Sequence, residues 1–324
     1  MNQFRRRQFL IAAGSAALLP HVAKAQSTKK MGRVGWLAAP AQLGLGLESF
    51  RAGMRERGWV EGENYSIEIR SGVPAQSAEL ATELVKAKVD LIVAPGGMLF
   101  GARTVIGDMP MVFGINGDPV LAKLAASYAR PGGNLTGLTS LSAELSGKRL
   151  ELLKEAAPGL TQFAALANQT HPGVQTEFDA THAAAKRLGI SVTWFPVYKP
   201  SEFASAFEAI ARQQAQALAA IPDNMINLQA KAVADFALGR GMPSISGWAE
   251  FAEAGNLLSY GPSYRGYYRH FAAYAEKILK GAKPADLPIE RPTILEFVVN
   301  LKTAKQLGIR IPQSVLVRAD RVIE

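Results

Sequence analysis

Residues 89–97, VDLIVAPGG, decide the fold class of this chain. Residues 89–94 are mostly apolar and β-branched and show no polar alternation, a pattern typical of a strand buried on both faces of a parallel sheet. Pro95, Gly96 and Gly97 then end the strand with a turn. The segment therefore predicts an α/β protein whose parallel sheet is covered by helices on both sides.

The same pattern continues on both sides of this strand, because short apolar runs alternate with amphipathic stretches. A cluster of turn residues at 130–134 interrupts it, and the small apolar residues 136–142 after the cluster are expected to cross between two lobes. We expect strands at 33–39, 65–70, 89–94, 111–115, 163–167, 192–197, 217–221, 244–246 and 295–300. We expect helices at 46–57, 77–88, 144–157, 174–188, 202–214, 226–238, 264–279 and 302–307.

These elements form two similar halves, which predicts two Rossmann-like lobes with parallel sheets and a cleft between them. We expect residues 32–140 to form the first lobe, with 262–290 returning to it. Residues 141–261 are expected to form the second lobe, with 291–324 returning to it. Such a chain crosses between its lobes several times.

The N-terminal residues 1–25 have the three parts of a secretory signal peptide. Arg5-Arg6-Arg7 is the basic start, residues 9–19 are apolar, and Ala23-Lys24-Ala25 fits a cleavage site after Ala25. Residues 6–10 also fit the twin-arginine pattern R-R-x-F-L, which favours Tat export. Arg5 and Ile11 depart from that pattern, so Sec export stays open. The apolar run of eleven residues is shorter than the roughly 20 that span a bilayer.

Composition narrows the class of protein further. Removal of residues 1–25 lowers the net charge from +9 to +5, and the remaining Lys and Arg are dispersed, so no nucleic-acid partner is expected. The chain has no cysteine, which excludes thiol catalysis, structural Cys zinc sites and lipid attachment through cysteine. We therefore expect a periplasmic protein without a lipid anchor, and a monomer.

A likeness to a known family lies in six blocks of the sequence, at residues 50–64, 129–138, 148–155, 251–262, 277–288 and 300–305. Together these blocks resemble the ABC transporter substrate-binding protein family, in particular its TrpX-like members, the tryptophan/tyrosine-type periplasmic binding proteins. The likeness extends over residues 32–324. It implies a type I periplasmic binding-protein fold that closes on a small ligand and delivers it to a membrane permease. In one loop, Ala94-Pro95-Gly96-Gly97-Met98, the chain departs from the Ala-x-Gly-Thr-type sequence usual in the family.

Candidate ligand-binding residues follow from a rule about open α/β sheets, in which ligands bind beyond the carboxyl ends of the strands. Asp118 and Asp223 are candidates to bind an ammonium group, although Asp at these positions is also common as a turn former or helix cap. Trp248 and Tyr260 are candidates to stack on an aromatic or apolar ligand. The full set is Ala39, Pro40, Gly96, Gly97, Asn116, Asp118, Asn168, Gln169, Asp223, Asn224, Trp248 and Tyr260.

Other aromatic residues are expected to pack inside the protein. Trp36 lies within a predicted strand, and the aromatic residues of the helix at 264–279 recur every three or four positions. Both patterns are typical of core residues.

An enzyme is disfavoured by the motifs that the sequence lacks. The histidines show no metal-binding spacing, and neither G-x-S-x-G nor the Walker A pattern occurs. Residues 44–49 begin like a dinucleotide fingerprint but have Ser49 at the third glycine position. We therefore expect no catalysis, no cofactor and no metal.

The sequence leaves the biological role and the ligand open. An importer component that captures an amino acid, aromatic or branched, is the first interpretation, and a broader apolar carboxylate is the second. A ligand-sensing module for a membrane receptor is the alternative role, and the sequence does not separate it from import.

Overall fold

The computed structural model describes residues 31–140, 142–171 and 173–324, and residues 32–324 form one compact unit. The predicted signal peptide lies outside the described residues. Within the described part, no helix combines the length and the apolar character needed to cross a bilayer. Two sheets organise the unit, and we call each sheet with its helices a lobe.

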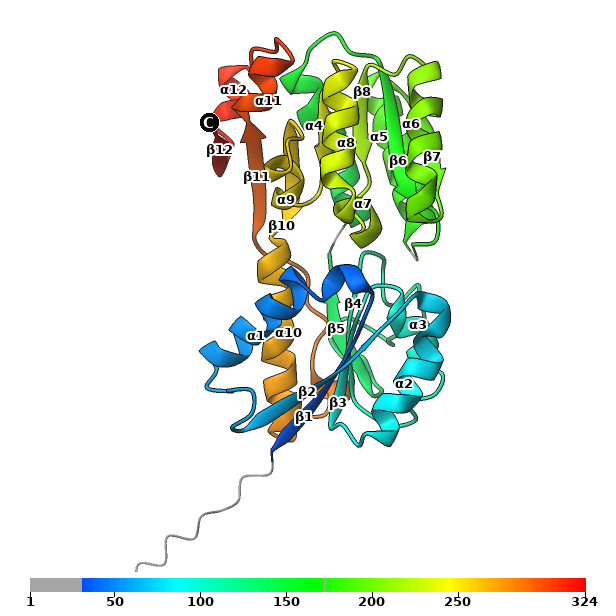
Figure 1. The fold of residues 1–324 in the computed structure, drawn as a ribbon, viewed down its shortest axis with the longest axis vertical. Coiled ribbons are helices and arrows are strands. Elements are labelled where there is room, and N and C mark those ends of the chain that lie inside the picture. Colours follow the sequence, from blue (N-terminus) through cyan, green and yellow to red (C-terminus); the bar gives the residue numbers. More distant parts are fainter. Residues whose placement is uncertain (1–30, 141, 172) are drawn as a thin grey trace, which may run out of the picture. The chain divides into compact units, whose positions relative to one another are not determined.

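The first lobe is built on a five-stranded sheet of order β2-β1-β3-β4-β5, in which every neighbouring pair is parallel (Figure 1). Short 3-10 turns at Pro40–Gln42 and Pro74–Gln76 follow β1 and β2. The elements are β1 (Gly32–Ala38), α1 (Leu45–Glu56), β2 (Tyr65–Ser71), α2 (Ser77–Lys86), β3 (Leu91–Pro95), α3 (Met98–Ala102), β4 (Met111–Ile115) and β5 (Leu135–Thr139).

Helices cover both faces of this sheet, as the alternation of side chains along a strand requires. Val34 and Trp36 in β1 pack into a core with α1 and with α10 (Tyr264–Leu279), while Leu37 points to the other core, with α2 and α3. Helix α10 comes from the C-terminal part of the chain and lies beside α1 (Figure 1). Trp36 is fully buried, as its place in a strand predicts.

The prediction that residues 136–142 only cross between the lobes is wrong for most of that stretch. Leu135–Thr139 is β5, which pairs along its length with β4. The pairing depends on Gly137, because a Cβ there would lie 1.9 Å from the backbone oxygen of Phe113. Gly137 also has φ +154°, a conformation that glycine adopts readily.

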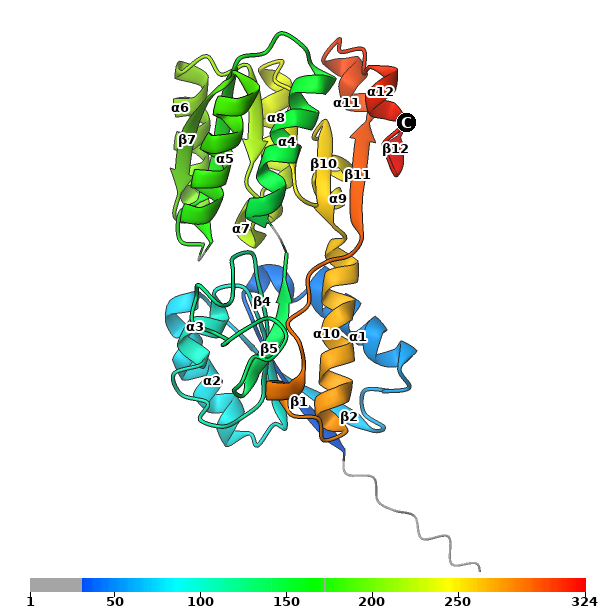
Figure 2. The ribbon, with the colours of Figure 1, turned by 180° about the vertical axis from the view of Figure 1, so that it is seen from behind.

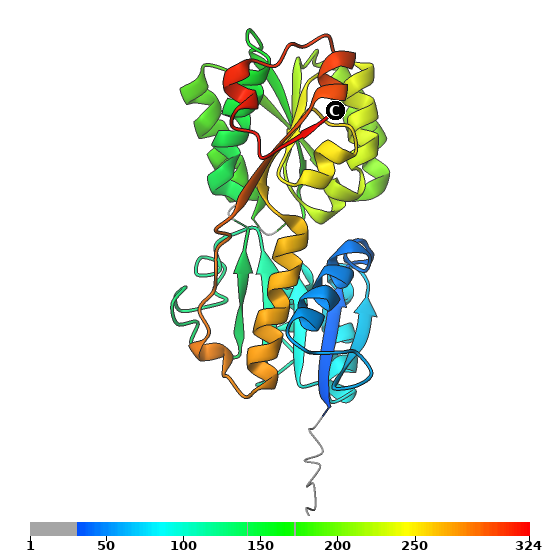
Figure 3. The same ribbon diagram turned by 90° about the vertical axis from the view of Figure 1, so that its left-hand side faces the viewer.

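The second lobe is built on a seven-stranded sheet of order β12-β11-β10-β9-β8-β6-β7 (Figure 2). Its elements are α4 (Ser142–Ala156), β6 (Gln162–Asn168), α5 (Val174–Leu188), β7 (Ser191–Val197), α6 (Phe203–Arg212), β8 (Ala217–Ala220), α7 (Asn224–Leu228), α8 (Ala230–Gly239), β9 (Ser244–Ser246), α9 (Ala249–Glu253), β10 (Leu258–Pro262), β11 (Leu295–Asn300), α11 (Leu301–Gln306), α12 (Gln313–Leu316) and β12 (Arg321–Ile323). Short 3-10 turns stand at Pro200–Glu202 and Pro284–Asp286. Figure 3 shows helices on both faces of this sheet, so the predicted α/β class is confirmed.

The second sheet differs from the prediction in being mixed. The chain leaves this lobe at the end of β10, forms α10 on the first lobe and returns at β11. Because it leaves and re-enters at the same end of the sheet, β11 runs antiparallel to β10. The helix predicted at 226–238 is also wrong in detail, because two helices, α7 and α8, occupy residues 224–239.

Candidate ligand-binding site

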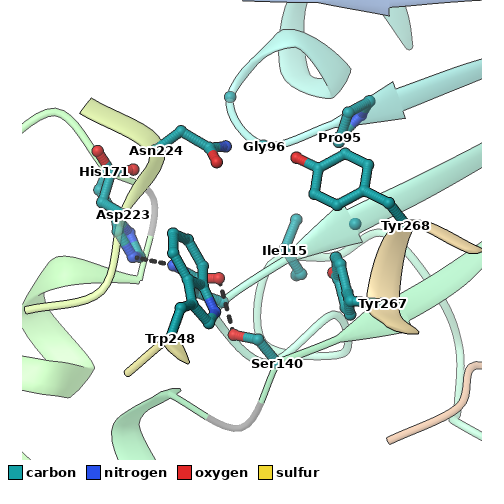
Figure 4. Close-up of a pocket in the computed structure, with 13 residues that line it drawn as sticks. Pro95, Gly96, Ile115, Ser140, His171, Asp223, Asn224, Trp248, Tyr267 and Tyr268 are labelled. Atoms are coloured by element: carbon teal, nitrogen blue, oxygen red, sulfur yellow. Dashed lines mark hydrogen bonds between the residues drawn. The ribbon is translucent and has the colours of Figure 1, made fainter. Parts of the chain in front are cut away.

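A pocket lies where the two lobes meet, and residues that follow the strand ends form most of its wall (Figure 4). It encloses about 40 Å³. Its position agrees with the general rule that ligands of α/β sheets bind beyond the carboxyl ends of the strands. The lining residues are Pro95, Gly96, Gly97, Gly114, Ile115, Asn116, Ser140, His171, Asp223, Asn224, Trp248, Tyr267 and Tyr268.

Gly96 and Gly97 bring peptide backbone to the first-lobe side of the pocket. Gly96 has φ +70° and its N–H donates to the backbone oxygen of Gly114 at 2.7 Å. A Cβ on Gly96 would approach Gln42 to 3.4 Å and Asn224 of the other lobe to 3.6 Å. These distances are ordinary van der Waals contacts, so it is the positive φ that favours glycine at this position.

Asn116 connects the two lobes beside the pocket. Its Nδ2 donates to the backbone oxygen of Pro222 in the second lobe at 2.7 Å and lies 3.0 Å from His171 Nε2. Ser140 Oγ donates to Asn116 Oδ1 at 2.7 Å and so fixes the orientation of the amide (Figure 4). The side chain of Asn116 is therefore held from both lobes.

Asp223 brings a carboxylate to the second-lobe side. Its Oδ1 accepts from the backbone N–H of Met225 at 2.8 Å, which caps α7, and from Asn168 Nδ2 at 2.9 Å. Neither bond uses Oδ2, so one oxygen can accept a donor from a ligand. Asn168 itself lies behind Asp223, where Thr170 donates to its Oδ1 through both its backbone N–H and its hydroxyl.

His171 and Glu177 form a buried pair next to Asp223. His171 is 5% exposed, Glu177 is fully buried, and His171 Nε2 lies 3.2 Å from Glu177 Oε2. The backbone N–H of Gly173 donates to His171 Nδ1 at 2.7 Å, a bond that only the neutral ring can accept, because Nδ1 of the charged ring carries a proton. Burial by itself lowers the pKa of His171, but the Glu177 carboxylate and, more weakly, Asp223 raise it to about 9.

Arg149 is a buried cation whose charge the Glu177 carboxylate influences, and it joins two of the segments that cross between the lobes. Its Nε donates to the backbone oxygen of Tyr260 at 2.9 Å and its Nη1 to that of Ser142 at 3.1 Å. Burial lowers the pKa of Arg149 to about 10, which still leaves the guanidinium charged at neutral pH, while the Glu177 carboxylate favours that charge.

Aromatic side chains form the remaining wall. The rings of Trp248 and Tyr264 are 5.1 Å apart in an edge-to-face arrangement, and those of Tyr264 and Tyr268 are 4.6 Å apart. Gln42 Nε2 donates to the Tyr268 hydroxyl at 3.0 Å, and Tyr267 donates to the backbone oxygen of Leu138 at 3.2 Å. Burial raises the pKa of Tyr268 to about 12, so its phenol is neutral.

Six of the predicted residues line this pocket, and they are Gly96, Gly97, Asn116, Asp223, Asn224 and Trp248. They follow β3, β4, β8 and β9. Asn168 does not line the pocket itself, but its Nδ2 donates to Asp223 Oδ1 and so holds a lining residue in place.

The other predicted residues lie outside the lining, where they make other contacts. Asp118 accepts from the backbone N–H groups of Val120 and Leu121 and from the Tyr128 hydroxyl. Gln169 accepts from Trp194 Nε1, and the ring of Tyr260 packs on Phe297. The backbone N–H of Ala39 donates to the Gln42 side chain, and Pro40 begins a 3-10 turn.

Four polar or aromatic lining residues were not predicted, and they are Ser140, His171, Tyr267 and Tyr268. Ser140 follows β5, so the strand-end rule finds it once β5 is recognised as a strand. His171 stands three residues beyond β6. The two tyrosines lie on α10, where their spacing indicates only packing.

Among the described residues, no group of three or more His, Asp and Glu side chains is placed so that it could hold a metal ion.

Comparison with known proteins shows which proteins this chain is similar to. A curated relative, the tyrosine-binding protein of Clostridioides difficile (strain R20291), is 25% identical over 296 residues, covering 89% of this chain and 84% of that protein. A conserved domain protein of Vibrio cholerae is 26% identical with a TM-score of 0.83, covering 90% of this chain and 100% of that one. The ABC domain from Streptococcus pneumonia in complex with L-Trp is 26% identical with a TM-score of 0.82, covering 91% and 100%.

A more distant solved structure shares the fold alone. It is an ABC transporter solute-binding protein of Bacillus halodurans with bound myo-inositol, 13% identical with a TM-score of 0.62, covering 86% of this chain and 98% of that one. The fold is that of type I periplasmic binding proteins, as the sequence resemblance implies. The family model described as ABC transporter substrate binding protein matches residues 43–323, and the chain belongs to this family.

Proposed function

We propose that this protein captures an amino acid or a related apolar carboxylate between its lobes and delivers it to the permease of an ABC importer. One observation carries the proposal: Asp223 presents a carboxylate with an unused oxygen to a pocket that also has an aromatic wall. Such a pair of features suits a ligand with an ammonium group and an apolar side chain.

Each part of the pocket has a chemical counterpart in such a ligand. Asp223 Oδ2 accepts from the ammonium group, and the backbone around Gly97 lies on the first-lobe side, where a ligand carboxylate needs donors. Trp248 and Tyr268 contact the apolar side chain. The tyrosine-binding and L-Trp-bound relatives support a ligand of this class.

Capture requires the lobes to separate and rejoin. The enclosed volume of about 40 Å³ is far below the roughly 300 Å³ of ordinary small-molecule pockets, so a free amino acid enters only when the lobes part. A ligand that contacts both lobes then favours the joined state, because it interacts with that state more strongly than with the separated one. This mechanism involves no catalysis.

The place of action follows from the N-terminal segment. Export through the Arg6-Arg7 signal and cleavage after Ala25 release the protein into the periplasm, where small solutes pass toward the inner-membrane permease. The absence of cysteine supports a protein without a lipid anchor.

Binding measurements on the protein without residues 1–25 test the proposal. Native mass spectrometry first identifies any ligand that remains bound after purification. Calorimetry then compares tryptophan, tyrosine, phenylalanine and leucine with the same compounds lacking the amino group. We expect micromolar or tighter binding of at least one amino acid and much weaker binding of its deaminated analogue. No heat with any compound, together with no copurified ligand, contradicts the proposal.

A further inference from the structure

Arg149 is a charged side chain deep inside the second lobe. It lies on α4 and is 4% exposed. A guanidinium is tolerated in such a place only where acceptors meet its N–H donors. Its Nε donates to the backbone oxygen of Tyr260 at 2.9 Å, and its Nη1 donates to that of Ser142 at 3.1 Å. One side chain therefore holds strand β10 and the start of helix α4 together.

The bond to Tyr260 lies where the pairing between two strands stops. The parallel pairing of β10 with β9 extends to Ser259, which lies opposite Ser246. Tyr260 is the next residue along β10, and a buried strand carbonyl needs a donor. Arg149 Nε supplies a donor to this carbonyl directly beyond the end of the pairing. The guanidinium thus continues the attachment of β10 to the lobe.

The third nitrogen of the guanidinium, Nη2, faces two glycines at the ends of β9 and β10. A Cβ on Gly247 would lie 3.0 Å from Nη2, and one on Gly261 would lie 3.3 Å from it. A Cβ on Gly261 would also lie 2.1 Å from the backbone oxygen of Gly247, and one on Gly247 would lie 2.3 Å from Pro222 Cγ. These three residues therefore form a tightly packed layer, and Arg149 contacts it from below.

The pocket and one of the lobe crossings begin immediately after this layer. Trp248 follows Gly247 and Asp223 follows Pro222, and both line the pocket (Figure 4). The chain beyond Gly261 leaves the second lobe and forms α10. A shift of the layer would therefore move the aromatic wall, the pocket carboxylate and a crossing segment together.

We propose that Arg149 is a positioning residue for the second-lobe half of the pocket, which places Trp248 by holding the backbone at the ends of β9 and β10. Its effect on ligand affinity rests on the proposed function, whereas its effect on Trp248 does not. Arg149 does not line the pocket, so it acts through the backbone that it contacts. Lysine cannot replace it, because an ammonium group lacks the planar fork that reaches two separate carbonyls.

Fluorine NMR of the complete mature chain, labelled with 5-fluorotryptophan, tests this inference without a ligand. The chain has four tryptophans, and substitution of each by phenylalanine assigns the four resonances. Trp36 and Trp59 belong to a core of the first lobe, and Trp194 lies on β7, an edge strand of the second-lobe sheet. These three report on the rest of the protein while Trp248 reports on the pocket.

The spectra are compared for the parent, Arg149→Lys and Lys148→Ala. Lys148 is the matched control, because it precedes Arg149 on α4 but pairs with Glu151 at the surface. We expect Arg149→Lys to shift or broaden the Trp248 resonance and to leave the Trp194 resonance in place. Affinity for the amino acid that the parent binds should fall about 2- to 10-fold, the loss of one well-aligned hydrogen bond to the ligand. Lys148→Ala should change neither.

Three results overturn the inference: an unchanged Trp248 resonance in Arg149→Lys, an equal shift of Trp194 in that variant, and an equal shift of Trp248 in Lys148→Ala. If Arg149→Lys does not fold, hydrogen exchange in the parent decides.

The Nε–H of Arg149, identified by its nuclear Overhauser contacts with Tyr260, should exchange with deuterium far more slowly than that of Arg212, whose side chain is 72% exposed. Slow exchange supports the inference, and equal rates contradict it. Failure of the parent to bind any amino acid contradicts the proposed function, while the Trp248 resonance still decides the role of Arg149.

Discussion

Asn116 of the first lobe donates a hydrogen bond of 2.7 Å to the backbone oxygen of Pro222 in the second lobe. Pro222 immediately precedes Asp223, the residue that caps α7 and supplies the pocket carboxylate. The bond therefore ties the end of β4 to the acidic side of the pocket. A contact of this kind belongs to the state in which the lobes are joined, and its loss should affect binding more than folding.

The first prediction concerns Asn116 itself. Asn116→Ala removes the donor to Pro222 and leaves the Ser140 hydroxyl without its acceptor. Only the bond to Pro222 joins the two lobes, and such a bond is worth about 0.5–1.5 kcal/mol, so we expect affinity for the bound amino acid to fall about 2- to 10-fold. Calorimetry measures the affinity, and the melting temperature should change by no more than a few degrees. A large loss of stability with unchanged affinity contradicts this account.

Gly117 offers a steric test of lobe closure. A Cβ on Gly117 would lie 3.4 Å from the Cα of Gly173 in the second lobe, an ordinary van der Waals contact, so we expect alanine to be tolerated and the larger side chain of valine to press against that lobe. We expect Gly117→Val to weaken amino-acid binding at least tenfold, while Gly117→Ala binds nearly as the parent does.

Gly133→Val is the control for Gly117→Val, because a Cβ on Gly133 meets no atom within 4 Å. Its affinity should match that of the parent. Equal effects of valine at the two positions, measured by calorimetry, would show that the lobe contact is not responsible.

Asp223 is predicted to discriminate ligands by their ammonium group. Asn also caps helices well, so Asp223→Asn should preserve α7 and the melting temperature. A charge-assisted hydrogen bond is worth about 1.5–3 kcal/mol, so we expect a 10- to 150-fold loss of affinity for the amino acid. Binding of the deaminated analogue should be unchanged or stronger.

Asp118→Asn provides the comparison for Asp223→Asn. Asp118 also follows β4, but it accepts from backbone N–H groups outside the pocket. We expect unchanged affinity for the amino acid in this variant. A loss of affinity as large as that in Asp223→Asn would show that the ammonium site is wrongly assigned to Asp223.

The pH dependence of stability should report on His171. Burial lowers its pKa, but Glu177 and Asp223 raise it to about 9, above the value of about 6.5 in an unfolded chain. The folded protein therefore binds a proton that the unfolded chain releases, and this stabilisation is complete below about pH 6.5 and disappears as the pH rises through about 9. Chemical denaturation at intervals from pH 6 to 10 measures it. His171→Gln should flatten the curve in this window, and an identical slope in both proteins is the contrary outcome.

Much of the fold can be read from the sequence, because local patterns report burial directly. The uninterrupted apolar run of β3 and the helical period of α5 predict both elements to within two residues of their observed bounds. Strand ends then locate Gly96, Asn116 and Asp223, since the carboxyl ends of parallel strands share one edge. The sequence pattern does not predict strand β5, because its pairing depends on the absence of a side chain at Gly137, which allows close contact with the backbone of Phe113.

The sequence by itself determined the α/β class and the order of most elements, because both follow from short-range periodicity and turn chemistry. It also located six pocket residues among the twelve that were predicted, because these six follow the ends of strands. Only the tertiary structure decided the rest. Tyr267 and Tyr268 reach the pocket because α10 packs beside α1, more than 200 positions earlier in the chain. His171 meets Asn116 because two loops from different lobes converge. Contacts between residues so distant in sequence leave no local pattern, so only the assembled fold reveals them.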